Sequence, residues 1–239
     1  MASVPVLVVN PVEGLASGPD EPLWYVEPYM DAVFRQAGDY LLKKDRAVRE
    51  EIWPATREHD VILAAGHGQA SAYTAYQLQR VYWVDMFRDG FQQSWLRNRK
   101  FFLLSCLAGR VLGKWLVDAG ASAFLGWKVP FAFFCDYGER REGEEHPDWL
   151  YLKPAEEAMV IFAEQGPKQA YGYLVEKYTE YVEREDLPER YRAALRADRD
   201  YLVLYTRGAE AALAPEWLGL LGFVPVAAVL GIVAANELL

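Results

Sequence analysis

VILAAGHG, residues 61–68, is an apolar run of strand length that ends at a histidine, His67, between two glycines. A second run, FFLLSCLAG at residues 101–109, has the same plan and delivers a cysteine, Cys106. Short continuous apolar runs are typical of strands that are buried on both faces of a parallel sheet. Because a thiol needs a base to become a nucleophile, these runs predict a thiol and an imidazole at the ends of two buried strands.

The rest of the chain alternates in the same way between apolar strands and helical stretches. Strands are predicted at Val4–Val9, Asp39–Leu42, Val61–Ala65, Phe101–Leu104, Ser122–Leu125, Val129–Cys135 and Tyr201–Tyr205, with a hairpin from Ala72–Gln77 to Gln79–Val84. Helices are predicted at Glu27–Ala37, Arg46–Arg57, Asp85–Arg97, Val111–Ala119, Pro154–Gln165, Lys168–Glu185 and Pro188–Ala197. This order predicts an α/β fold with a mostly parallel sheet.

Composition narrows the class of protein. Hydrophobic residues make up 52% of the 239 residues, which is enough for a core and argues against disorder. The net charge of −9 argues against a nucleic-acid partner, because a polyanion would be repelled. Only two cysteines are present and no secretory signal is recognised, so a reducing, cytoplasmic compartment is expected. No Cys/His cluster has metal-ligand spacing, and no cofactor is expected.

The C-terminal region differs from the rest. We expect an α/β domain over residues 1–214 and a hydrophobic tail over residues 215–239, in which Trp217–Ala235 carries no charge. That stretch is long enough to cross a bilayer, which would associate the protein with a membrane. The alternative is a segment buried in the core or in a partner complex.

The neighbours of the histidine and the cysteine suit nucleophilic catalysis. In an open parallel sheet, catalytic groups collect at the carboxyl ends of the strands, where His67 and Cys106 are both expected. The amides of Gly68 and Cys106 are candidate donors to an oxyanion, and a helix starting after Cys106 would favour its thiolate. Against this stands the simpler interpretation of a buried cysteine and a turn histidine.

Several of these segments together resemble a known clan. The order is an apolar strand, Gly-His-Gly, a second strand, Ser-Cys-x-x-Gly, a helix and then GASAFLGW at residues 120–127. It resembles the caspase-like cysteine peptidases, and within them the gingipain, clostripain and CHAT-domain branches. The resemblance implies a caspase-hemoglobinase fold, a three-layer α/β/α sandwich. It also implies that His67 is the catalytic histidine, that Cys106 is the nucleophile, and that Gly68 and the Cys106 amide form the oxyanion hole.

One feature of the clan is missing. Several of its families carry an acidic residue just before the cysteine, which shapes the S1 pocket, whereas Leu104 and Ser105 precede Cys106 here. Specificity for a basic P1 residue would need another acid. Asp136 and Glu139 are the candidates for substrate binding, although charged loop residues are more often solvated.

The remaining reactive residues are expected to have other roles. Cys135 is expected to be a buried strand residue, His59 an exposed turn residue and His146 a solvated loop residue. Arg140-Arg141 lies in a charged loop, where caspase-like enzymes are often cut, and suggests self-cleavage.

The favoured function is therefore a cysteine endopeptidase that acts on a polypeptide through the pair His67 and Cys106. The alternative is a catalytically silent caspase-like module that binds or assembles with partners and is anchored through its tail. A third interpretation is a hydrolase or transferase on a flavodoxin-like fold. It is disfavoured because residues 10–14 after the first strand do not form a Gly-rich phosphate loop.

Overall fold

The computed structural model describes residues 4–11, 23–76, 79–81, 93–133, 148–207 and 209–212. The predicted tail over residues 215–239 lies outside these residues. So do several predicted site and loop residues: Cys135, Asp136, Glu139, Arg140, Arg141 and His146.

The centre of the molecule is a mixed sheet in which parallel neighbours predominate. Its strands lie in the order β2 (Tyr40–Lys43), β1 (Val6–Asn10), β3 (Val61–Gln69), β6 (Lys100–Ser105), β7 (Ala123–Trp127), β8 (Leu202–Thr206) and β9 (Ala209–Ala212). Neighbours from β2 to β7 are parallel, whereas β8 and β9 are each antiparallel to the strand before them. The predicted α/β fold with a mostly parallel sheet is confirmed.

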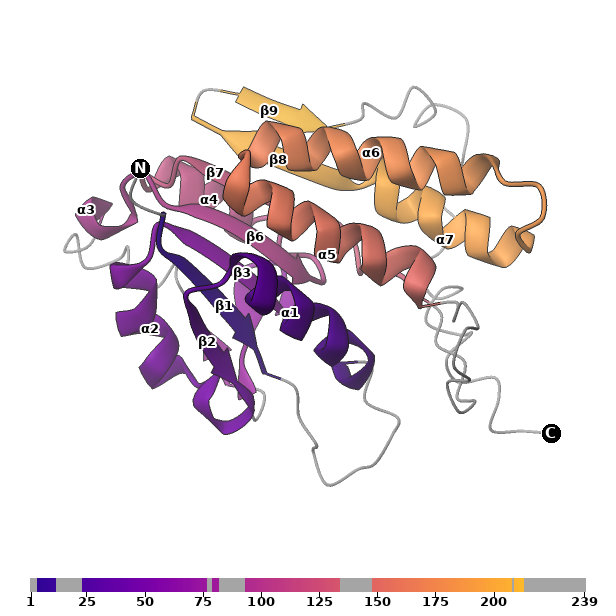
Figure 1. Cartoon of the computed structure of the whole chain (residues 1–239). Helices are drawn as coiled ribbons and strands as arrows, with labels where there is room; N and C mark the ends of the chain where they lie inside the picture. Colours follow the sequence, from indigo (N-terminus) through magenta and orange to yellow (C-terminus); the bar gives the residue numbers. More distant parts are fainter. Residues whose placement is uncertain are drawn as a thin grey trace.

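Helices cover both faces of this sheet and make a three-layer sandwich (Figure 1). One face is covered by α1 (Leu23–Ala37), α5 (Trp149–Glu164), α6 (Pro167–Glu183) and α7 (Glu189–Asp200). The other face is covered by α2 (Arg49–Glu58), α3 (Gln93–Leu96) and α4 (Leu112–Asp118), and a short 3₁₀ turn, η1 (Lys44–Arg46), precedes α2.

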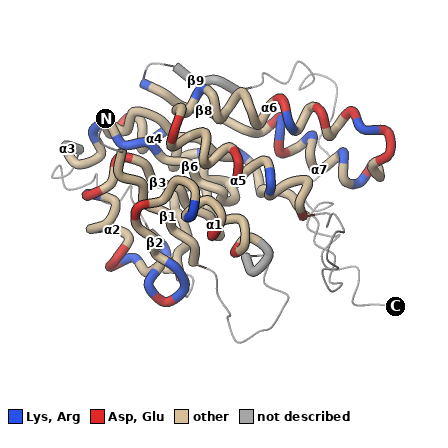
Figure 2. The backbone as a smooth tube through the Cα atoms, in the orientation of Figure 1, with Lys and Arg blue, Asp and Glu red and all other residues tan. Residues whose placement is uncertain are grey.

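The strands are apolar on both faces because both faces are covered. Along β3, Val61 and Leu63 pack into the core beneath α1 and α5, whereas Ile62 and Ala64 pack into the core on the side of α2 and α4. This is the physical reason for the continuous apolar run that begins at Val61. Figure 2 shows the consequence for charge, because the charged residues gather on the outer helices and the loops while the strands are mostly uncharged.

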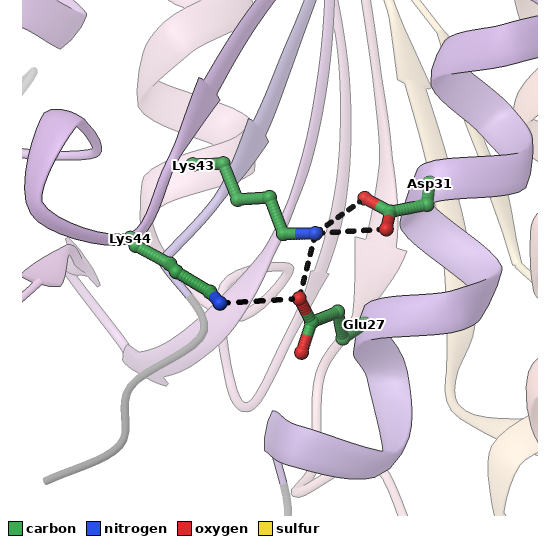
Figure 3. Close-up of polar contacts among 4 residues, drawn as sticks. All are labelled: Glu27, Asp31, Lys43 and Lys44. Carbon is green, nitrogen blue, oxygen red and sulfur yellow. Dashed lines mark hydrogen bonds and ion pairs between the residues drawn. The ribbon is translucent and has the colours of Figure 1, made fainter.

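An ion-pair cluster joins α1 to the edge strand β2 (Figure 3). The Lys43 Nζ lies 2.6 Å from Glu27 Oε1 and 2.8 Å from Asp31 Oδ2, and Lys44 Nζ lies 3.7 Å from the same Glu27 oxygen. Although burial works against the charged form, hydrogen bonds to Asp31 and Glu27 raise the pKa of Lys43 overall. The cluster therefore ties the first helix to the end of its neighbouring strand.

The segment after β7 contradicts one prediction. Residues 129–133 do not form the strand expected at Val129–Cys135, and β8 takes the place beside β7. The Ala132 N–H donates instead to the side chain of Asp198, 2.9 Å away, and the ring of Phe131 packs on Trp127 with centroids 4.7 Å apart. Because the Ala132 N–H is bonded to a side chain and not to a neighbouring strand, this apolar segment packs on the core without joining the sheet.

Other differences concern the lengths of elements. The helix expected at Asp85–Arg97 is described only as the short α3, and β9 was not predicted. Among the described residues, no helix combines the length and the apolar character that a membrane span requires.

Candidate active site

The two reactive residues are carried by neighbouring strands. β3 and β6 are paired in parallel, and their ladder ends with Gly66 opposite Ser105. His67, which is still in β3, and Cys106, which directly follows β6, are the next residues, so both come after the same step of the ladder. The predicted adjacency of the two strand ends is therefore part of the sheet topology.

β3 is longer than the strand that the apolar run predicted at Val61–Ala65. It continues to Gln69 because the short strand β4 (Ala72–Thr74) pairs with it in antiparallel fashion, with His67 opposite Thr74. β5 (Arg80–Val81) completes the predicted hairpin. His67 thus lies within a strand and is partly buried, and the alternation of side chains puts it on the same face as Ala65.

Gly68 is packed against the backbone of the cysteine. A Cβ added to Gly68 would overlap Ser105 Oγ and the Cys106 carbonyl oxygen, and it would lie 3.1 Å from the Cys106 nitrogen. Only a residue without a side chain allows the two chains to approach this closely. Gly68 and Cys106, the two predicted oxyanion donors, are therefore brought together.

Ser105 has a structural role that sequence reasoning missed. Its side chain is 1% exposed, and its hydroxyl donates to the His67 carbonyl oxygen over 2.9 Å. The sequence drew attention to this position only because an acid was absent. The signal that could have revealed the bond is a small hydroxyl at the end of an otherwise apolar strand, where a buried donor needs a partner.

The surroundings of Cys106 disfavour its thiolate and raise the pKa of the thiol. Burial raises its pKa, a hydrogen bond from the Phe131 backbone lowers it, and the charge of Asp198 raises it again. The net direction is upward, and the residue is only partly accessible. A nucleophilic role therefore requires that a base, or a change on substrate binding, remove the proton.

The turn that follows Cys106 differs from the prediction. Residues 106–111 form turns, and α4 begins only at Leu112, so Cys106 does not stand at a helix start and the expected dipole effect is wrong. Leu107 has a φ of 61°, which is rare for a bulky residue. Backbone strain of this kind gathers at functional sites, because the surrounding structure must hold it in place.

A buried amide lies at the same edge of the sheet. Asn10 ends β1, the neighbour of β3 on its other side, and is 1% exposed. Among the described residues its Nδ2 finds no hydrogen-bond partner. Sequence reasoning placed Asn10 only in a loop and missed it.

The other candidate residues lie elsewhere. His59 is partly buried, its Nδ1 lies 2.7 Å from the Ala55 carbonyl oxygen at the end of α2, and its ring stacks on Tyr40. A hollow on the outer surface is lined by residues of α2 and contains neither reactive residue: Arg49, Glu50, Trp53, Pro54 and Arg57. Within the described parts of the chain, no three His, Cys, Asp or Glu side chains converge to hold a metal ion.

Comparisons with known proteins add little to this geometry. No protein-family model matches the chain, and no curated protein matches it. A solved structure titled as a complex of the pro- and mature domains of RgpB from Porphyromonas gingivalis is similar, with a TM-score of 0.47 and 11% identity over 85% of this chain. The match spans 47% of that protein chain, about half its length. A likeness of this size assigns neither a family nor a function.

Proposed function

We propose that the chain is a cysteine endopeptidase in which His67 and Cys106 form the catalytic pair. The observation that carries the proposal is the parallel register of β3 and β6, which ends at Gly66 and Ser105 and so brings the next residues, His67 and Cys106, to one edge of the sheet. The sequence resemblance to caspase-like peptidases points to the same pair.

The chemistry follows from the residue types. The Cys106 sulfur attacks the scissile carbonyl carbon, and His67 takes the thiol proton and passes it to the leaving amine. The amides of Gly68 and Cys106 donate to the oxyanion that forms. Water then hydrolyses the thioester, which releases the acid and restores the thiol.

The raised pKa of Cys106 sets a condition on this mechanism. Because burial disfavours the thiolate, the free protein reacts slowly until His67 accepts the proton. A polypeptide that covers the strand ends would exclude water and strengthen the pairing of thiolate and imidazolium.

The test is to measure alkylation by iodoacetamide and by a peptidyl acyloxymethylketone, residue by residue, with mass spectrometry. We expect Cys106 to react with the ketone faster than Cys135, and the His67→Ala variant to lose this preference. Cys106→Ala is the control for peptide hydrolysis. Equal labelling of the two cysteines by the ketone, with no hydrolysis of a mixed peptide library, would contradict the proposal.

A second candidate function is a silent module that binds partners through the same scaffold. The observation that favours it is the partly buried thiol of Cys106, whose pKa is raised by burial. Association with a membrane or a complex through Trp217–Ala235 belongs to both proposals. The ketone separates them, because a silent module would leave Cys106 unlabelled while the protein stays folded.

A further inference from the structure

A buried carboxyl group lies on α7, outside the proposed catalytic pair. Asp198 is 0% exposed, and burial raises its pKa well above the ordinary aspartate value. Its Oδ1 accepts the Ala132 N–H, whereas its Oδ2 has no hydrogen-bond partner among the described residues. Burying a carboxyl group with an unpaired oxygen costs free energy, so the contacts of Asp198 call for an explanation.

Asp198 holds the last residue of β7, Trp127, and the segment that follows this strand. Its carbonyl oxygen accepts the Trp127 Nε1–H over 2.8 Å, and its side chain accepts the Ala132 N–H over 2.9 Å. Residues 127–129 also accept hydrogen bonds from the turn that follows Cys106. The Leu107 N–H donates to the Val129 carbonyl oxygen over 3.1 Å, and the Gly109 N–H donates to the Trp127 carbonyl oxygen over 2.8 Å.

The thiol is reached through this segment. The Phe131 backbone, one residue before the Ala132 N–H that Asp198 binds, hydrogen-bonds Cys106 and lowers its pKa against the larger effect of burial. The two peptide groups share the Phe131 Cα, so the anchor on the Ala132 N–H limits how far the Phe131 backbone can move away from Cys106.

We propose that Asp198 is a positioning residue, which holds the backbone around Ala132 so that the segment from Val129 to Ala132 stays against the turn after Cys106 and the Phe131 backbone stays beside the thiol. The proposal rests on the proposed role of Cys106 as a nucleophile. It extends that role to a residue on the last helix of the described chain. Asp198 does not touch the reacting atoms. The proposed positioning acts through the backbone, and it is opposed by the charge of Asp198, which raises the pKa of Cys106.

Other titratable groups surround the two side chains. The pKa values of Tyr151 on α5 and Tyr178 on α6 are raised, mainly by burial and to a smaller extent by the charge of Asp198. Their hydroxyls donate to the carbonyl oxygens of Tyr191 and Tyr151 respectively. Arg199 and Asp200 on α7 pair with each other over 2.7 Å, and His67 is the titratable group on the strand beside Cys106.

The test compares two substitutions of similar size. Asp198→Asn keeps an oxygen for the Ala132 N–H, whereas Asp198→Leu removes it. The rate of Cys106 alkylation by iodoacetamide is measured against pH, with mass spectrometry to separate Cys135. We expect the midpoint for Asp198→Leu to lie roughly one pH unit above that for Asp198→Asn, because a hydrogen bond to the thiolate is lost.

Controls separate positioning from general loosening. Asp148 is another fully buried aspartate, and its side chain accepts a hydrogen bond from the Tyr29 hydroxyl. Asp148→Asn should leave the pH profile of Cys106 alkylation unchanged. Coinciding midpoints for Asp198→Asn and Asp198→Leu, with both variants folded by circular dichroism, would overturn the proposal. The readout needs no peptide hydrolysis, so a shift in an inactive protein would refute the peptidase while it supports the role of Asp198.

A second measurement does not depend on the Leu variant. Amide hydrogen exchange is followed by NMR in the wild-type protein and in Asp198→Asn. We expect slow exchange at Phe131 and Ala132 in both. If these amides exchange in the wild type at the rate of an unstructured peptide, Asp198 does not hold the Phe131–Ala132 backbone, and the proposal is overturned.

Discussion

The backbone around Cys106 leaves no room for additional side-chain atoms. Gly68 lies against the Cys106 carbonyl group, Ser105 bonds the His67 carbonyl oxygen, and Leu107 is held at a positive φ. Each of these constraints acts on a residue next to the proposed pair. They fix the backbone from which the imidazole and the thiol project, and preorganisation of this kind is what catalysis requires.

The tightest of these contacts gives a direct prediction. Gly68→Ala should lower the free energy of unfolding by about 1–3 kcal/mol, because the new Cβ overlaps Ser105 Oγ and the Cys106 carbonyl group. Urea denaturation measures the change, and peptide hydrolysis should be lost.

Gly172→Ala is the matched control. Nothing lies within 4 Å of its added Cβ, and it should stabilise the exposed face of α6 by about 0.5–1 kcal/mol. Equal effects at the two glycines would contradict the packing of Gly68.

At the scale of elements, the strands that carry the site were predicted best. The apolar runs at residues 61–65 and 101–104 are β3 and β6, because continuous burial on both faces leaves a clear pattern. The extension of β3 to Gln69 was not predicted. It depends on pairing with β4, and on the Tyr73 hydroxyl, which donates to the Ala65 carbonyl oxygen over 2.6 Å. Pairing partners of this kind leave no periodic signal in the strand itself.

The junction of α1 and β2 provides a test at this scale. Lys43→Met should lower the free energy of unfolding by about 1 kcal/mol, because the side chain makes two partly buried ion pairs. The pKa of Lys43 is raised in the folded protein, so this contribution is present below the ordinary lysine pKa and is lost as the pH rises through the folded value.

Urea denaturation at low and high salt measures the effect of Lys43→Met. The difference from wild type should shrink in roughly 1 M salt, where screening is strong. Lys114→Met, which breaks an exposed pair with Asp118, should change stability by less than about 0.5 kcal/mol. A salt-independent loss at Lys43 would point to packing of its methylene chain instead of charge.

At the scale of the whole molecule, the two cores differ in polarity. The core beneath α1, α5, α6 and α7 also encloses buried carboxyl groups, among them Asp148, Glu156 and Asp198. Burial raises the pKa of Asp198 well above the ordinary aspartate value. The molecule therefore holds on one side of its sheet a group whose protonation is linked to folding.

The sign of this linkage makes a prediction for the whole fold. The folded pKa of Asp198 is raised, so the folded protein binds a proton that the unfolded chain releases above its ordinary pKa of 3.8. The favourable contribution is complete below that value and is lost as the pH rises toward the folded pKa. The wild type should therefore lose stability relative to Asp198→Asn as the pH rises above about 4. Urea midpoints of both proteins, measured from below pH 4 upward, give this difference in stability. Parallel pH profiles would show that folding does not raise the pKa of Asp198.

The sequence by itself determined most of the alternation of strands and helices and the two apolar runs that lead to His67 and Cys106. Burial imposes a local period on the chain, and that period can be read without knowing the neighbours. Only the tertiary structure decided that Ser105 bonds His67, that residues 129–133 leave the sheet, and that Asp198 anchors the segment beside Cys106. These contacts join residues far apart in the chain. Their energy comes from pairing buried polar groups, which no local pattern records.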